Sequence, residues 1–131
     1  MPTRTWYPGK NLVLKTHEEM LSEFGGHAGF ERGIQLLDVV LKEMKRTKGI
    51  CGKAAVLLRR LVDVRIFCDG NHRTAYAITD IFLRMNGERI RVDDELKVIR
   101  FIKDIKSYNV IEIEAWLRDG KVPKRPRCRS S

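Results

Sequence analysis

Residues 71–87 have the sequence NHRTAYAITDIFLRMNG, and their apolar residues surround most of the helix that this stretch predicts. Those residues are Ala75, Ala77, Ile78, Ile81, Phe82, Leu83 and Met85. A helix that is apolar on most sides usually lies buried at the centre of a fold. The Asn86-Gly87 pair is a good stop, because Gly87 can take the left-handed conformation that ends many helices. We therefore expect a central helix over residues 71–86.

Apolar residues also recur at helical spacing before this segment, over residues 33–46 and 53–66. Residues 15–24 favour a helix that Gly25-Gly26 ends, since adjacent glycines weaken a helix and supply turn conformations. Further along, Asp93 or Asp94 can cap a helix, and Asn109 with Glu112 resembles a capping box for the last one. The pattern predicts an all-α, single-domain, compact bundle of about six helices around the central helix, with little or no sheet.

The chain has 131 residues, which suits one domain. We expect an extended N-terminal arm over residues 1–11, a helical domain over 12–120 and a basic, disordered tail over 121–131. The net charge is +9, and the tail contributes five of these charges with no acid, so the first 120 residues have a net charge of only +4. The fold itself therefore need not bind a polyanion.

The composition, 43% hydrophobic and 33% charged, is typical of a soluble globular protein. No run of about 18 apolar residues predicts a membrane span, and no apolar N-terminal stretch predicts a secretory signal. The three cysteines, Cys51, Cys68 and Cys128, are scattered and form no Cys-x-x-Cys pair. We expect neither a disulfide framework nor a structural zinc site, and a reducing cytoplasm as the compartment.

The segment with the clearest chemistry is residues 65–75, RIFCDGNHRTA, where a short polar loop precedes the central helix. The first backbone N–H groups of a helix and its dipole form an anion site, for which phosphate is the usual guest. Gly70 allows close approach to the backbone, Asn71 can cap the helix and donate its amide, and Arg73 offers a planar fork for phosphate oxygens. Asp69 is a hard oxygen ligand of the kind that Mg²⁺ needs beside a nucleotide.

An ordinary turn and cap is the alternative for this segment, because Asp-Gly-Asn often precedes a helix. The position of Arg73 favours the anion site. A cation in the first helical turn is locally unfavourable unless an anion binds there.

This stretch resembles the loop-and-helix motif of the Fic/Doc family, which runs His, any, Phe, any, Asp/Glu/Asn, Gly/Ala, Asn, any, Arg. The motif is matched in order and spacing by Phe67, Asp69, Gly70, Asn71 and Arg73. The resemblance extends over residues 12–120. It favours the Doc (death-on-curing) branch through Thr74-Ala75, Phe82-Leu83-Arg84, Asn86-Gly87 and, upstream, Glu23-Phe24-Gly25-Gly26.

The resemblance implies roles for the matched residues. Asp69 would hold Mg²⁺, Gly70 and Asn71 would form the anion nest, Arg73 would bind nucleotide phosphate, and Phe67 would anchor the loop in the core. His72 falls at a variable position, where it either donates near the phosphates or faces solvent.

The implied activity is transfer of a phosphoryl or AMP group from ATP or another nucleotide, with Mg²⁺, to a Ser, Thr or Tyr hydroxyl of a target protein. The implied role is toxin-like, with a separate antitoxin as a candidate partner. No Glu in the sequence is followed by Gly or Asn, so the family's built-in inhibitory motif is absent. Tyr76 replaces the second motif Arg of many Fic members, as in Doc-like proteins. A membrane is not expected as a partner, and nucleic acid is the less favoured one.

The chain departs from the motif at Arg65, where the family has the His that acts as general base. Arginine cannot accept a proton at neutral pH, so activity is expected to be impaired. Arg65 continues the apolar stripe of Leu58 and Leu61, which predicts that it points inward or into the cleft, and a buried Arg needs an anionic partner. It would bind phosphate, pair with an internal acid such as Asp69 or Asp80, or be an inactivating change.

Two other functions compete with an impaired transferase. One is a catalytically silent pseudoenzyme that binds a nucleotide or a partner protein. The other is a nucleic-acid binder that uses the basic tail. Substitute bases would have to come from His17, His27, His72 or Cys68.

Overall fold

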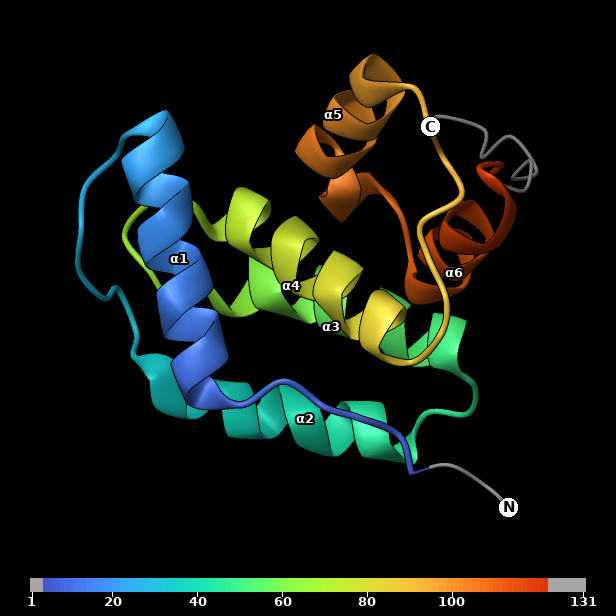
Figure 1. The fold of residues 1–131 in the computed structure, drawn as a ribbon, viewed down its shortest axis with the longest axis horizontal. Coiled ribbons are helices and arrows are strands. Elements are labelled where there is room, and N and C mark those ends of the chain that lie inside the picture. Colours follow the sequence, from blue (N-terminus) through green and yellow to red (C-terminus); the bar gives the residue numbers. More distant parts are fainter. Residues whose placement is uncertain (1–3, 123–131) are drawn as a thin grey trace, which may run out of the picture.

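The computed structural model describes residues 4–122, and these fold into six α-helices and two short 3₁₀ helices (Figure 1). The α-helices are α1 (Lys10–Phe24), α2 (Leu37–Arg46), α3 (Ile50–Val64), α4 (Asn71–Met85), α5 (Glu95–Lys103) and α6 (Val110–Asp119). The 3₁₀ helices are η1 (Ile34–Leu36) and η2 (Ile105–Ser107). The only β-structure in this part of the chain is an isolated antiparallel bridge between Phe30 and Phe67. The predicted all-α bundle of about six helices is confirmed.

Helices α3 and α4 lie side by side, α2 and α6 pack on α3, and α1 packs against α4 (Figure 1). Helix α3 is therefore enclosed by three helices, and residues 54–58 are all buried. Helix α4 packs against α3, α1 and α5 and buries six of its own residues, so the prediction of a bundle around a central helix is confirmed. One face of α4 stays partly open because α1 and α5 do not close over it, and Tyr76, Ala77 and Ile81 are only half-buried along a groove there.

Helix α1 begins at Lys10, five residues before the predicted start at Lys15. Its buried residues Thr16 and His17 lie one helical turn after Val13, and all three face the core. The Trp-Tyr-Pro-Gly turn signal therefore ends at Gly9, and the last two residues of the predicted arm are helical. As predicted, α1 stops at the glycine pair, where Gly25 has a φ of 80°.

The C-terminal helices have the caps that the sequence predicts. Asp94 caps α5 by accepting hydrogen bonds from the backbone N–H groups of Leu96 and Lys97. Asn109 and Glu112 form a capping box at the start of α6. Most of the predicted disordered tail, residues 123–131, lies outside the described residues.

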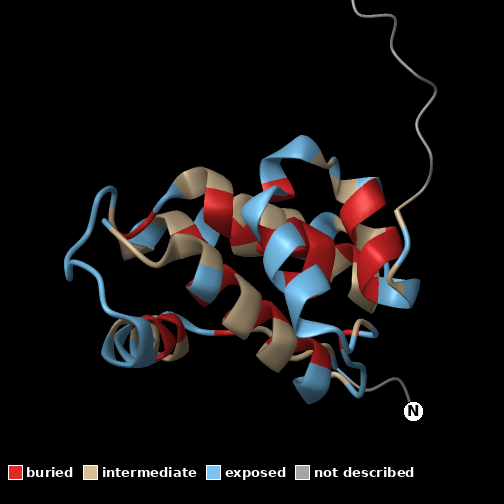
Figure 2. Ribbon diagram, turned by 90° about the horizontal axis from the view of Figure 1, so that it is seen from above, coloured by how far each residue is buried: buried red, intermediate tan, exposed pale blue. Residues whose placement is uncertain are grey.

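Buried side chains form one core, which all six α-helices enter (Figure 2). Helices α5 and α6 join it through an aromatic stack in which the Phe101 and Trp116 ring centroids are 3.9 Å apart. At the other end Asn86 holds the N-terminal arm. It accepts from the Trp6 N–H at 2.9 Å and donates to the Trp6 carbonyl at 3.0 Å. No helix between residues 4 and 122 is long and apolar enough to cross a membrane.

Candidate functional site

The loop between α3 and α4 begins with an unusual backbone conformation at Arg65. Its φ of 47° and ψ of 60° place it in the left-handed region, alone among the non-glycine residues of the described chain. This conformation costs energy in residues with a Cβ. It also ends the helical geometry of α3, so the Arg65 side chain does not continue along the apolar face of that helix.

As a consequence Arg65 is exposed, so the part of the prediction that turns its side chain inward was wrong. Its Nε donates to a carboxylate oxygen of Glu31 at 2.8 Å, rather than to Asp69 or Asp80. The hydrogen bond from Arg65 to Glu31, followed by the charge of Glu31, raises the pKa of the guanidinium still further. Arg65 therefore remains a cation at any physiological pH and accepts no proton.

Phe67 is buried and forms the centre of an aromatic stack, as expected for an anchor of the loop. The His17 ring of α1 lies parallel to it, with ring centroids 3.6 Å apart and an angle of 5° between the planes. Phe30 stacks on it at 5.6 Å. The loop is thus held between α1 and the segment that follows α1.

His17 also fixes the next part of the loop. Its Nε2 donates to the Asp69 carbonyl at 2.8 Å, and the side chain is buried. Sequence reasoning considered His17 only as a substitute base and missed this contact. A helix that starts at Lys10 places His17 on the same buried face as Val13, so the correct helix start would have predicted that His17 is buried.

Asn71 holds the loop from its other end. Its Nδ2 donates to the Phe67 carbonyl at 2.7 Å, and its Oδ1 accepts from the Phe67 N–H at 3.1 Å. The side chain therefore does not cap α4, contrary to prediction. The side-chain amide is used within the protein, which leaves only the backbone N–H of Asn71 available for an anion. The cap residue of α4 is Gly70, with a φ of 77° that suits glycine.

Asp69 lies half-buried immediately before this cap. One carboxylate oxygen accepts from the backbone N–H of His27 at 2.9 Å. Gly26 packs so closely that an added Cβ would lie 3.2 Å from the Asp69 Cβ. The carboxylate is thus positioned by the glycine-rich segment after α1, residues 25–33, as well as by its own loop.

Residues 25–33 run beside the loop and bond to its backbone. The Ile66 carbonyl accepts from Glu31 and Arg32 at 2.9 and 3.2 Å, and the Cys68 N–H donates to the Gly29 carbonyl at 3.1 Å. No hydropathy period predicts this pairing, because four of these nine residues are glycines. We refer to this segment as the strap.

His72 and Arg73 occupy the first turn of α4. The guanidinium carbon of Arg73 lies 4.2 Å from the ring centroid of Phe24, a cation–π contact with the end of α1. His72 is half-buried, and burial, assisted by Lys106 and Arg65, lowers the pKa of its imidazole. Its ring is therefore neutral at pH 7 and offers one donor and one acceptor.

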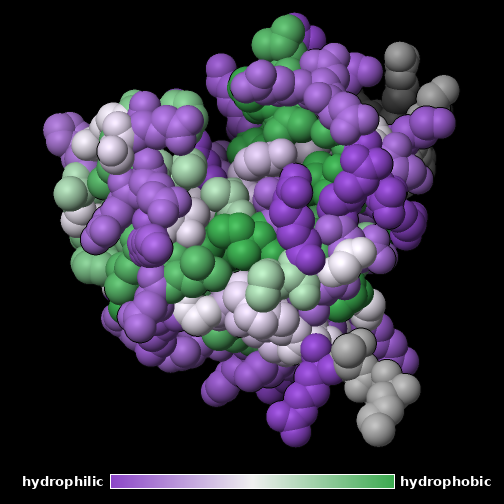
Figure 3. All heavy atoms as spheres, viewed as in Figure 1, coloured by the Kyte–Doolittle hydropathy of each residue, from purple (hydrophilic) through white to green (hydrophobic). Residues whose placement is uncertain are grey.

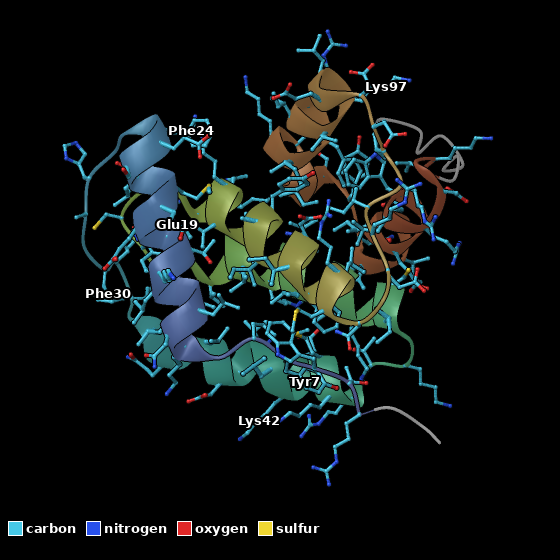
Figure 4. The ribbon with its side chains drawn as sticks, viewed as in Figure 1. Tyr7, Glu19, Phe24, Phe30, Lys42 and Lys97 are labelled. Atoms are coloured by element: carbon cyan, nitrogen blue, oxygen red, sulfur yellow. The ribbon has the colours of Figure 1, made fainter. Side chains whose placement is uncertain are left out.

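Both residues line a groove of about 910 Å³ between α1, α4 and α5. Figure 3 shows a hollow between the α1 and α5 sides of the molecule, with hydrophobic residues along its floor. In Figure 4, Glu19 and Phe24 lie on the α1 side, and Lys97 lies on α5 across the hollow. The motif loop and the start of α4 are therefore next to a large open surface.

The predicted site residues lie together, since Phe67, Asp69, Gly70, Asn71, His72 and Arg73 form one loop and the first turn of one helix. Arg65 lies at the start of this loop but is paired with the strap. A comparison with family models matches residues 7–83 to the model described as Fic/DOC family. None of the curated proteins compared with the chain matches it.

Proposed function

Because this chain belongs to the Fic/DOC family, we propose that it is a Doc-like protein that binds Mg²⁺ and a nucleotide phosphate at the start of α4. The reaction we propose is transfer of a phosphoryl or AMP group to a Ser, Thr or Tyr hydroxyl of a cytoplasmic protein. We also propose a separate antitoxin as its inhibitor. The observation that supports this most strongly is the junction of Asp69, Gly70 and the first turn of α4, which hydrogen bonds from His17 and Asn71 hold in place.

The phosphate would bind at the N-terminus of α4. Gly70 has no side chain and a positive φ, so an anion can approach the backbone there. The positive end of the helix dipole favours a negative group at that place. Arg73 in the first turn is exposed, and its guanidinium can form two parallel hydrogen bonds with phosphate oxygens.

The donor set at Asp69 suits Mg²⁺ bound together with a nucleotide. Among residues 4–122, no group of three His, Cys, Asp or Glu side chains converges as a complete metal cage. Mg²⁺ commonly binds through one or two carboxylates with waters and substrate phosphates, so one carboxylate beside an anion site is enough. Mg²⁺ would neutralise charge that develops on the phosphate oxygens.

The chain has no residue at the motif's first position that can accept the proton of the attacking hydroxyl. As the hydroxyl oxygen bonds to phosphorus and the bond to the leaving phosphate breaks, that proton needs an acceptor. Arg65, paired with Glu31, cannot accept it. Since a positioned base typically contributes about 10²–10⁴-fold, we expect slow transfer from this chain. The same observation favours the second candidate, a silent family member that binds a nucleotide or a partner protein.

Labelled ATP distinguishes the two candidates. A cell extract is incubated with Mg-ATP labelled at the α- or γ-phosphate and with the protein, its Arg65→His variant, or Arg65→His combined with Asp69→Ala. Transfer by Arg65→His that the added Asp69→Ala abolishes would support a transferase site, and the labelled phosphate would identify the transferred group. The binding role would be supported if none of these proteins transfers label and if Asp69→Ala and Arg73→Ala each weaken the binding of Mg-ATP. Unchanged binding in both of those variants would refute the anion site.

A further inference from the structure

The groove between α1, α4 and α5 has an excess of acidic side chains. It is lined by five acids and only two full cations: Glu19, Glu23, Asp80, Asp93 and Glu95 against Arg73 and Lys103. Asp80 pairs with Arg84, and Asp93 lies 3.9 Å from Arg89. Among residues 4–122, Glu19, Glu23 and Glu95 have no ion pair within 4.0 Å. These three exposed carboxylates lie on both sides of the groove.

The floor of the groove is apolar and partly open to solvent. Phe24 and Ile99, on opposite sides, are 52% and 53% exposed. Met20, Ile81 and Ile102 also line the groove. An apolar floor with an acidic rim suits a segment that has long basic side chains and few acidic ones, which the rim would repel. The aliphatic stems of Lys and Arg can cover the apolar surface while their charged ends reach the rim.

The chain itself has such a segment close to the groove. Helix α6 is capped by Gly120, where an added Cβ would lie 3.1 Å from a methyl carbon of Val92, a residue that lines the groove. The nine residues 123–131 include Lys124, Arg125, Arg127 and Arg129 and no acid. Fully extended, nine residues span at most about 30 Å, which is enough to enter the groove from this end.

We propose that residues 123–131 dock in the groove of their own chain, with their Lys and Arg side chains paired with Glu19, Glu23 and Glu95. Each exposed pair contributes a factor of only about 1.4 to 5 in affinity. Tethering supplies the rest, because a short linker gives an effective concentration in the millimolar range. The docked segment would lie beside His72 and Arg73. This proposal concerns the groove alone and does not depend on nucleotide transfer.

The test uses the full chain with a nitroxide spin label on Cys128, in a Cys51→Ser/Cys68→Ser background. Amide NMR signals of α1 and α5 residues that line the groove should be broadened by the label at low salt. Raising the salt to about 0.5 M should remove most of this broadening, because exposed pairs are then screened. The triple variant Glu19→Gln/Glu23→Gln/Glu95→Gln should reduce the broadening by more than half.

The matched control is Glu18→Gln/Asp38→Asn/Asp104→Asn, which changes net charge equally at exposed residues that do not line the groove. It should leave the broadening unchanged. Broadening that is absent, lies elsewhere, or is lost equally in the control would overturn the proposal. A further control mixes two kinds of chain: spin-labelled chains that give no NMR signal, and isotope-labelled chains without a spin label. Broadening in this mixture would also overturn the proposal, because the segment would then dock on a second copy.

Discussion

Replacing Asn71 with Ala tests whether the loop before α4 is held by the two hydrogen bonds between Asn71 and Phe67. Both are short, at 2.7 and 3.1 Å, and partly buried. A hydrogen bond contributes a net of about 0.5–1.5 kcal/mol, so losing two should cost about 1–3 kcal/mol. For a chain of this size each kcal/mol corresponds to about 3–5 °C, so Tm should fall by about 3–15 °C.

Asn86 provides the control, because it holds the Trp6 backbone with the same pair of bonds at a place away from the motif loop. Its Nδ2 also donates to the Phe82 carbonyl at 2.8 Å, so Asn86→Ala should lose at least as much stability as Asn71→Ala. Only Asn71→Ala should also weaken Mg-ATP binding, by about tenfold or more if 1.4 kcal/mol of loop ordering is lost.

Urea unfolding followed by tryptophan fluorescence measures the stability of both variants, and calorimetric titration with Mg-ATP measures binding where the folded state dominates. The reasoning is refuted if Asn71→Ala is as stable as the parent. It is refuted equally if both variants lose Mg-ATP binding to the same extent, because the loss would then follow from general destabilisation.

Three further outcomes are expected. His17→Ala should cost about 2–4 kcal/mol in urea, because it removes a buried hydrogen bond to Asp69 and a ring stack. His17→Gln, which keeps a hydrogen-bond donor, should bind Mg-ATP better than His17→Ala. Equal binding by the two variants would contradict the role of His17 in holding the loop at Asp69. Arg65→Gly should raise the urea midpoint, since glycine adopts a positive φ freely; a lower midpoint would show that the pair with Glu31 outweighs the strain. Because folding lowers the pKa of His72, the unfolded chain binds the proton first as the pH falls below about 6.5, and stability declines. The urea midpoint of His72→Gln should therefore decline less between pH 7 and 5, and an equal decline would show that other groups cause it.

The sequence predicted the helices well because their stripes and caps are local signals. The capping box of Asn109 and Glu112 involves residues three apart, and the stop at Gly25 depends on one backbone conformation. The start of α1 was placed too late. Pro8-Gly9 indicates a turn, but no neighbouring residue shows where that turn ends and the helix begins. Only packing of Val13 and His17 against the core settles that boundary.

The site was harder to predict, because its key contacts join residues far apart in the chain. His17 and Asp69 are 52 residues apart, and Arg65 and Glu31 are 34 apart. The periodicity that placed Arg65 inward assumes that α3 continues, whereas the helix ends one residue earlier, at Val64. A periodic argument cannot detect a single left-handed residue, and that residue decides where the side chain lies.

For the function proposed above, the position of Arg65 predicts that phosphate binding and proton transfer can be separated. The contacts that hold Asp69 and the start of α4 come from His17, His27 and Asn71, and none involves the Arg65 side chain. Changing Arg65 should therefore leave Mg-ATP affinity close to that of the parent while altering the rate of transfer. Histidine is among the residues that tolerate the left-handed region, so Arg65→His need not move the backbone. If that variant instead loses Mg-ATP affinity together with any transfer, the ion pair between Arg65 and the strap must support the anion site, and the two functions cannot be separated.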